Sequence, residues 1–298
     1  MSGSNSGTLL GCLQGLLSNN FSISETPLGL DEKAPVGWNS TLYLENDYPF
    51  SGGTAHSRDL ARRIAVAEAY ERALVDRLCE SAERRSEFLL NEIPSCSGFA
   101  AGFSQTKTEM RALCEAVERW AWSKWIDDGY ALKEIAGVRV PSALANFLRA
   151  SFVETRFFQQ DLLVNTGWRI LELKILIFLG FTENGVFPGS RVCLPSECCW
   201  DHPVIEASRN FVNFGGGSPL FERRFIASDI IAKRAMFFSA NRDVATLQVS
   251  RAVRSEWPKA SLRLFREFKT DIPAVFLWRA ICDGGVPWHE GPVDRFVY

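Results

Sequence analysis

Residues 94–128 read PSCSGFAAGFSQTKTEMRALCEAVERWAWSKWIDD, in which a loop of small residues leads into a long amphipathic helix. Thr106 and Glu109 have the spacing of a capping box, so we predict that the helix begins at Thr106. Gly129 follows the last apolar residues and is expected to end the helix. Apolar side chains recur along one face at helical spacing, namely Met110, Leu113, Cys114, Val117 and Ala121.

Two carboxylates lie near the middle of this predicted helix. Glu118 borders the apolar face, and Glu115 lies one turn earlier. Two carboxylates three residues apart on a half-buried helix repel each other unless a cation lies between them. The pattern therefore predicts a site for a metal ion or a phosphate group.

The same element, E-A-x-E-R, occurs once before, within the segment SRDLARRIAVAEAYERALVDRL. There Glu68, Glu71 and Arg72 follow one another at the spacing that the later helix repeats. On a helical wheel Glu71 falls inside the apolar stripe, so its carboxylate needs a partner. The alternative is that Glu68 to Arg72 and Glu115 to Arg119 are ordinary surface ion pairs, each worth about 0.2–0.5 kcal/mol. A looser third copy lies in residues 205–210, where Glu206 begins the sequence E-A-S-R-N.

These residues are similar to those of the YcaO family. Its members share a loop that ends in Ala-Ala-Gly before a helix with E-x-x-E-R, and an earlier helix with the same element. In this chain the loop runs from Ser95 to Gly102, between the two E-A-x-E-R elements. The resemblance covers residues 53–130 closely and the remainder loosely. The two elements with the loop between them are specific, whereas a single E-x-x-E-R is not.

The resemblance implies a peptide-modifying enzyme. YcaO proteins typically use ATP to activate a backbone amide of a ribosomally made precursor peptide, and azoline-type heterocycles result. The paired glutamates hold magnesium against the triphosphate and an arginine meets phosphate, which suits the oxygen preference of magnesium and the geometry of arginine. The implied catalytic residues are Glu68, Glu71, Glu115 and Glu118. The implied nucleotide-like pocket consists of Arg72, Arg119, Lys107, Ser95 and Ser97.

Four positions depart from the pattern of the family. Thr54 stands where a lysine is usual, and Ile64 stands where a serine is usual. Phe103 replaces an asparagine, and Lys107 replaces a carboxylate or amide that would help to bind a metal ion. We therefore expect neither ATP nor magnesium, and no other cofactor, in this chain. The retained glutamates are expected to position a peptide amide, to act as general bases or to pair with Lys107.

If magnesium is bound after all, Glu71 and Glu118 are its expected ligands. The function that we predict is that of a YcaO-like component in the maturation of a bacteriocin or antibiotic peptide, most similar to the trifolitoxin-processing type. It would modify backbone amides or form azolines without ATP, together with a flavin-dependent dehydrogenase that carries FMN. Two alternatives stay open: an ATP-dependent azoline cyclodehydratase, and a non-catalytic subunit that presents the precursor peptide.

The expected fold class is α+β, with mixed sheets flanked by helices around a large cleft floored by the two E-A-x-E-R helices. We predict one domain over residues 1–298, with an N-terminal segment (1–50), a core (51–130) and a remainder (131–298). Strands are predicted at 38–43, 168–180 and 273–282, helices at 141–150 and 202–214, a turn-rich stretch at 185–190 and a glycine-rich mobile loop at 213–219.

Composition favours an ordinary globular protein, with 46% hydrophobic and 23% charged residues. A net charge of -2 argues against general affinity for nucleic acid or anionic membranes. The longest apolar run is too short to span a bilayer, and the first residues lack the basic region of a signal peptide. Scattered cysteines suit free thiols in a reducing compartment, so we expect a cytoplasmic protein.

Three tryptophans, Trp120, Trp122 and Trp125, lie close together on the second E-A-x-E-R helix. One helical face cannot bury all three internally, and exposed aromatic patches often mark interfaces. The sequence therefore predicts that this helix contacts the dehydrogenase partner.

Overall fold

The computed structural model describes residues 20–29, 35–45, 48–214, 230–270, 272 and 274–296. The chain divides into two compact units. The first unit consists of Met1–Leu28, Gly37–Leu113 and Leu264–Ala280, and the second consists of Gly29–Val36, Cys114–Arg263 and Ile281–Tyr298. Among the described helices, none is long and apolar enough to cross a membrane. The single domain stays a prediction, and most of the predicted glycine-rich loop, from residue 215 on, lies outside the described residues.

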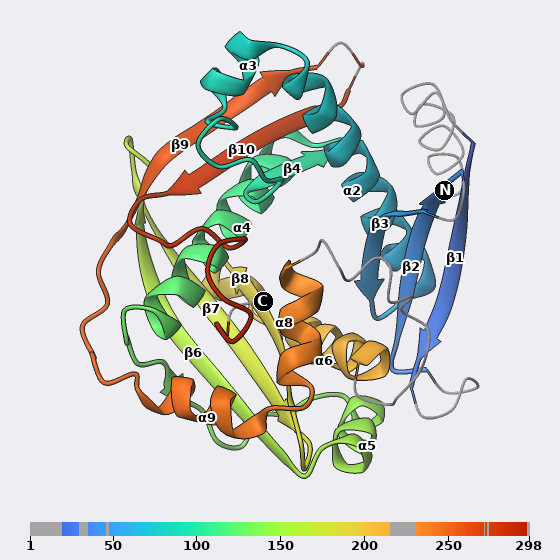
Figure 1. The fold of residues 1–298 in the computed structure, drawn as a ribbon, viewed down its shortest axis with the longest axis vertical. Coiled ribbons are helices and arrows are strands. Elements are labelled where there is room, and N and C mark those ends of the chain that lie inside the picture. Colours follow the sequence, from blue (N-terminus) through green and yellow to red (C-terminus); the bar gives the residue numbers. More distant parts are fainter. Residues whose placement is uncertain are drawn as a thin grey trace. The chain divides into compact units, whose positions relative to one another are not determined.

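The helices and strands are drawn in Figure 1. The first unit holds β1 (Phe21–Leu28), β2 (Gly37–Leu44), β3 (Tyr48–Ala55), α2 (Arg58–Cys79), α3 (Ala82–Glu87) and β4 (Phe99–Gly102). The second holds β5 (Lys133–Glu134), α5 (Ser142–Ser151), β6 (Glu154–Asn165), β7 (Ile170–Phe181), β8 (Val186–Cys193), the short 3-10 helix η1 (Pro195–Glu197), α6 (Asp201–Phe214), α8 (Ile230–Phe238) and α9 (Arg242–Ser250). Three elements run from one unit into the other: α4 (Gln105–Ile126), β9 (Ala260–Lys269) and β10 (Phe276–Cys282).

The strands of the described residues form two sheets. One is three-stranded in the order β1-β2-β3, and both of its pairs are antiparallel. The other is seven-stranded, in the order β4-β10-β9-β6-β7-β8, with β5 paired to β6. Its β6–β9 pair is parallel, with Val164 opposite Ala260, whereas β6–β7 and β7–β8 are antiparallel. The predicted α+β class, with mixed sheets and flanking helices, is confirmed.

Close contact between strand and helix sets the geometry of the first unit. Helix α2 runs beside β3 (Figure 1) and begins after Ser57, whose side chain accepts a hydrogen bond from the Leu60 N–H. A side chain at Gly53 would place its Cβ only 2.1 Å from the Ala61 carbonyl oxygen and 2.5 Å from the Ala65 nitrogen. Residue 53 must therefore be glycine if β3 is to lie directly on α2. The core of this unit consists mainly of aliphatic and aromatic residues of α2, β2, β4 and β10.

In the second unit, helix α6 packs directly on strand β8, as α2 packs on β3 in the first unit. A Cβ on Gly189 of β8 would lie 2.0 Å from the Pro203 carbonyl oxygen of α6. The predicted helices at 141–150 and 202–214 are confirmed as α5 and α6, and the three predicted strands are confirmed as β2, β7 and β10.

The predicted turn-rich stretch at 185–190 is wrong, because Val186 begins strand β8. Pro188 and Gly189, which are typical of turns, lie inside this strand. The reason is that β8 is the last strand in the order of its sheet. A proline is tolerated in an edge strand when its missing N–H would point away from the neighbouring strand.

The predicted capping box at Thr106 is also wrong. Helix α4 begins at Gln105, so Thr106 lies in its first turn. Instead the Ser104 carbonyl accepts hydrogen bonds from the backbone N–H of Thr108 at 2.9 Å and from its hydroxyl at 2.8 Å. The predicted end is confirmed, since α4 stops at Ile126 and Gly129 follows with φ of +74°.

The exposed aromatic patch predicted on α4 is wrong, because all three of its tryptophans are buried. The exposed fractions are 3% for Trp120, 0% for Trp122 and 2% for Trp125. Residues far away in the sequence cover them. The ring centres of Trp120 and Trp257 are 6.1 Å apart, and those of Trp125 and Phe158 are 5.5 Å apart. This part of α4 is buried on more than one face, which a single helical stripe does not predict.

Candidate functional site

The first group of predicted residues forms what we call the α2 carboxylate site, consisting of Glu68, Glu71 and Arg72. The Gly52 N–H donates to Glu68 Oε2 at 3.0 Å. Arg72 donates to Glu68 Oε1 through Nη2 at 2.6 Å and through Nε at 3.1 Å. Both oxygens of Glu68 are therefore bound by the chain, and Gly52 can come this close because Gly53 lets β3 approach α2.

Burial separates Glu71 from Glu68 within this site. Glu71 is only 7% exposed, as its position inside the apolar stripe predicts. The side chains of Glu68 and Arg72 are 31% and 43% exposed, so their ion pair is of the ordinary surface kind and of small energy. Burial lowers the pKa of Arg72, but the charge of Glu68 and its hydrogen bond outweigh that effect, so the pKa is raised overall.

The loop that carries Ser95 and Ser97 is fixed from β10. The Ser97 N–H donates to Ser95 Oγ at 3.3 Å. Arg279, which is fully buried, donates from Nη2 to the carbonyls of Ile93 at 2.8 Å and Ser95 at 3.1 Å, and its guanidinium lies 4.6 Å from the centre of the Phe99 ring. Burial lowers the pKa of Arg279 to about 10. The loop therefore owes its position to a buried cation that the sequence did not single out.

Lys107 points to solvent. It is exposed and forms no ion pair with any residue in the described parts of the chain. The expected pairing of Lys107 with the retained glutamates is therefore not observed among those residues. Phe103 is 42% exposed and meets the ring of Tyr70 edge-on at 5.7 Å.

The second group forms the α4 carboxylate site, which we define as Glu115, Glu118, Arg119, Ser190 and Glu206. Ser190 Oγ donates to Glu118 Oε1 at 2.6 Å, and the Val192 N–H donates to Glu118 Oε2 at 3.3 Å. Arg119 Nη2 lies 4.0 Å from Glu115 Oε1, and Arg119 Nη1 lies 3.9 Å from Glu118 Oε1. One donor on each oxygen fixes the plane of the Glu118 carboxylate.

Glu206, from the third copy of the motif, belongs to the same site. The Ser190 N–H donates to Glu206 Oε2 at 2.8 Å, and Arg209 lies 3.9 Å from Glu206 Oε1. Ser190 thus binds Glu206 through its backbone and Glu118 through its side chain, while its hydroxyl oxygen accepts the Trp122 indole N–H at 3.0 Å.

The geometry of β8 explains why these carboxylates gather there. Pro188, Ser190 and Val192 alternate along an edge strand, so they share the side of the backbone that faces away from β7. The N–H groups of Ser190 and Val192 are bound by Glu206 and Glu118, and proline has no N–H to leave unpaired. Sequence reasoning missed Ser190 because Pro188 and Gly189 resemble a turn. The only local feature that could have pointed to Ser190 is that it directly follows Pro188 and Gly189, two residues typical of turns.

Cys114 lies beside Glu118 but is unsuited to nucleophilic chemistry. Burial, and then the negative charge of Glu118, raise the pKa of the Cys114 thiol to about 12. Since the thiolate is the nucleophilic form, this thiol is inert at neutral pH.

Magnesium is the ion that the resemblance implies, so its fit can be tested on the donors present. Within the described residues, no three His, Cys, Asp or Glu side chains converge as a metal site. Both oxygens of Glu68 and of Glu118 accept hydrogen bonds from the chain itself. These residues do not fit a magnesium site that is built from protein ligands alone. Magnesium usually binds one or two carboxylates and completes its coordination shell with phosphates and water.

No protein-family model matches the chain, and no curated protein matches it. A YcaO protein from Methanopyrus kandleri, solved with AMPPCP and Mg2+ bound, matches with a TM-score of 0.58 and 14% identity, over 95% of this chain and 91% of that chain. A chain of the E. coli microcin synthetase McbBCD complex with pro-MccB17 bound matches with a TM-score of 0.56 and 12% identity, over 87% of this chain and 86% of that chain.

A heterocyclase solved in complex with substrate and cofactor matches with a TM-score of 0.58 and 10% identity, over 98% of this chain and 54% of that chain. Likeness at such low identity establishes architecture, and it agrees with the motifs from which the family resemblance was drawn. The trifolitoxin-processing type stays a prediction. The chain has the YcaO fold.

Proposed function

We propose that this chain is the YcaO-type component of a complex that matures a ribosomally made bacteriocin or antibiotic peptide. In this role it modifies backbone amides of the precursor or forms azoline-type heterocycles, without ATP and together with a flavin-dependent dehydrogenase that carries FMN. The observation that carries the proposal is the presence of both E-A-x-E-R helices in a YcaO fold, with Glu68 and Glu118 held in place by donors of the chain.

The proposed chemistry needs an exchange of protons and the stabilisation of a charge. A Cys, Ser or Thr side chain of the precursor attacks the carbonyl carbon of the preceding amide and loses its proton to a base. The former amide oxygen takes up that proton from the base and a second proton from solvent and leaves as water, and the ring nitrogen carries positive charge until its own proton returns to solvent. Buried Glu71 is the residue that we assign to proton exchange, and Glu118, with its plane fixed, is assigned to stabilise the positive charge.

Replacement of the usual nucleotide contacts supports the independence from ATP. Thr54, at the usual lysine position, is buried and donates its hydroxyl to Asn39 Oδ1 at 3.1 Å. Phe103 contacts Tyr70 at an asparagine position, and Lys107 brings a positive charge where a metal-binding group is usual. Losing one charge-assisted phosphate contact costs about 1.5–3 kcal/mol, and each 1.4 kcal/mol is roughly a tenfold loss of affinity.

In the first test, the purified chain, the precursor and the dehydrogenase are combined in nucleotide-depleted buffer, and the peptide mass is followed by mass spectrometry. We expect a loss of one water per ring, followed by the smaller loss that accompanies oxidation when the flavin enzyme is present. The dehydrogenase is also expected to co-purify with the chain. A lone chain that retains no partner and leaves the peptide mass unchanged would contradict the proposal.

In the second test, calorimetry with ATP and magnesium is expected to detect no micromolar binding to the natural chain. The double variant Phe103→Asn/Lys107→Glu restores two residues usual in the family, so we expect it to bind the nucleotide more tightly. Micromolar binding to the natural chain, or a strict requirement for ATP in the modification assay, would instead support an ATP-dependent azoline cyclodehydratase. The relative solved with AMPPCP and Mg2+ makes that outcome the specific rival.

A further inference from the structure

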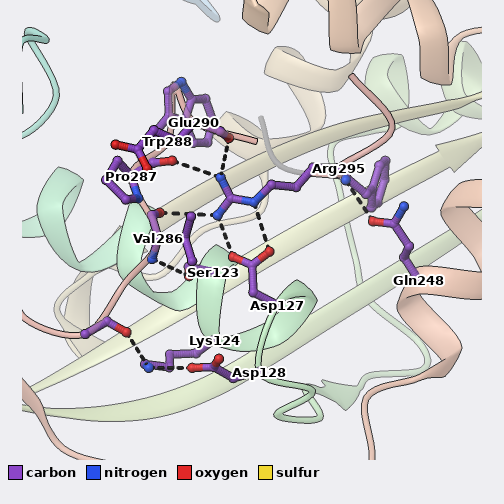
Figure 2. A network of polar contacts seen from close by, with 12 residues as sticks. Ser123, Lys124, Asp127, Asp128, Gln248, Val286, Pro287, Trp288, Glu290 and Arg295 are labelled. Carbon is purple, nitrogen blue, oxygen red and sulfur yellow. Dashed lines mark hydrogen bonds and ion pairs between the residues drawn. The ribbon is translucent and has the colours of Figure 1, made fainter. Parts of the chain in front are cut away.

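The segment Val286–Phe296 follows β10 and contains no helix or strand, yet it is held by many polar contacts (Figure 2). Arg295, 7% exposed, donates to Asp127 of the α4 end through Nε at 2.9 Å and through Nη2 at 2.5 Å. The same guanidinium donates to the carbonyls of Val286 at 3.2 Å, Pro287 at 2.9 Å and Glu290 at 3.0 Å. The backbone of this segment is thus wrapped around the guanidinium group of Arg295.

A second cation holds the segment from helix α8. Arg234 is fully buried and donates to the carbonyls of Trp288 at 2.6 Å, Glu290 at 2.5 Å and Pro292 at 3.3 Å. A buried guanidinium is costly unless its donors are bound. The carbonyls of this irregular segment meet that need, so its conformation and the burial of the two arginines depend on each other.

Gly291 allows the two arginines to meet the segment so closely. It has φ of +90°, and a Cβ there would lie 3.0 Å from Arg295 Cδ and 3.6 Å from Arg234 Nη2. The end of the segment is fixed as well, since the Phe296 N–H donates to Gln248 Oε1 at 2.8 Å and the Phe296 ring is fully buried. We call this arrangement the C-terminal clamp.

The clamp presents one aromatic ring to the α4 carboxylate site. The guanidinium carbon of Arg119 lies 3.6 Å from the centre of the Trp288 ring. Such stacking uses the face of a guanidinium, whereas its N–H groups lie in the plane and point past the edge of the ring. A stacked arginine is therefore restricted in orientation while hydrogen bonding at its edge is retained.

We propose that Trp288 is a positioning residue for Arg119, and that the C-terminal clamp keeps its ring in place. Arg119 then meets a substrate oxygen with its orientation fixed in advance, so less conformational freedom is lost on binding. The inference deepens the proposed function and rests on it: it adds that Arg119, 3.9 Å from Glu118 Oε1, contacts an oxygen of the precursor peptide.

The stacking is tested without any substrate, by NMR of the arginine side chains. Ring currents of Trp288 are expected to shift the Arg119 signal upfield, and the Arg119→Lys variant identifies that signal. Trp288→Leu is expected to abolish the shift and Trp288→Phe to retain part of it. An Arg119 signal that does not move in Trp288→Leu would overturn the proposal.

The clamp is tested by Gly291→Ala, with Gly167→Ala as the matched control. Gly167 has φ of +94°, but a Cβ there would meet nothing within 4 Å, so the control carries the backbone strain without the crowding. We expect Gly291→Ala to reduce the ring-current shift of Arg119 and Gly167→Ala to leave it unchanged. Equal spectra for the two variants would show that the clamp does not hold Trp288.

Kinetics then separate this inference from the proposed function. In the peptide modification assay, Trp288→Leu is expected to raise the KM for the precursor about tenfold with little change in kcat, and Trp288→Phe is expected to restore most of the loss. A fall in kcat with unchanged KM would contradict a positioning role in binding. If Arg119→Lys leaves the kinetics unchanged while the NMR shift is present in the natural chain, the stacking holds but Arg119 does not contact the substrate, so this inference fails and the proposed function stands.

Discussion

Replacing Glu118 or Glu71 by glutamine is expected to lower kcat/KM for peptide modification by about 100-fold or more, the usual effect of removing a proton-transfer or charge-stabilising group. At Glu118 the change removes charge with little change of shape. The amide oxygen can accept the Val192 N–H, and the amide NH2 can donate to Ser190 Oγ, whose hydroxyl hydrogen rotates away. A loss of activity in a folded Glu118→Gln variant therefore reports the negative charge and not the fold.

At Glu71 the same change removes the group assigned to proton exchange from a buried position. The measurement is single-turnover modification of the precursor followed by mass spectrometry, with thermal unfolding as the check on folding. Glu80→Gln is the control, since Glu80 is an exposed residue at the end of α2. Unchanged peptide mass shifts in both Glu71→Gln and Glu118→Gln would remove the catalytic role and favour a subunit that only presents the precursor.

Trp125→Ala is expected to lower the free energy of unfolding by about 3–5 kcal/mol, because it empties the volume of a large buried ring. Trp125 is 2% exposed and contacts Trp122 at 5.2 Å and Phe158 at 5.5 Å. Trp168→Ala is the matched control, since the Trp168 ring is 63% exposed and a surface change usually alters stability by less than about 0.5 kcal/mol.

Both variants are measured by chemical denaturation of the purified chain. A Trp125→Ala variant as stable as the natural chain, with weakened binding of the dehydrogenase, would restore the interface that the sequence predicted for α4. Equal losses for the two variants would show that burial does not govern the effect.

Sequence reasoning succeeded where a single helix carries the information. The helical period predicted α2 and placed Glu71 inside the apolar stripe, where the structure buries it, and the glycine at position 129 predicted the end of α4. The paired E-A-x-E-R elements and the loop between them gave the fold class. These features are local, so they can be read from residues a few positions apart.

Features that depend on residues far apart in the chain could not be predicted from the sequence. The hydrogen bond from Ser190 to Glu118 joins residues 72 apart in the chain, and no residue pattern within β8 predicts it. The tryptophans of α4 were misjudged for the same reason, because Trp257 and Phe158, which cover Trp120 and Trp125, come from outside the helix. Arg279 was missed as the anchor of the Ser95 loop because its partners are backbone carbonyls, which any residue supplies.

The way in which β8 ends its sheet limits how a peptide can be recognised. Extended peptides often bind by strand addition, in which the outward N–H and C=O groups of an edge strand pair with the backbone of the ligand. At Ser190 and Val192 the outward N–H groups are already bound by Glu206 and Glu118. A precursor that lengthened this sheet at β8 would have to displace both carboxylates, and with them the residue assigned to stabilise the reaction. Recognition of the precursor backbone and activity at Glu118 are thus mutually exclusive along this edge.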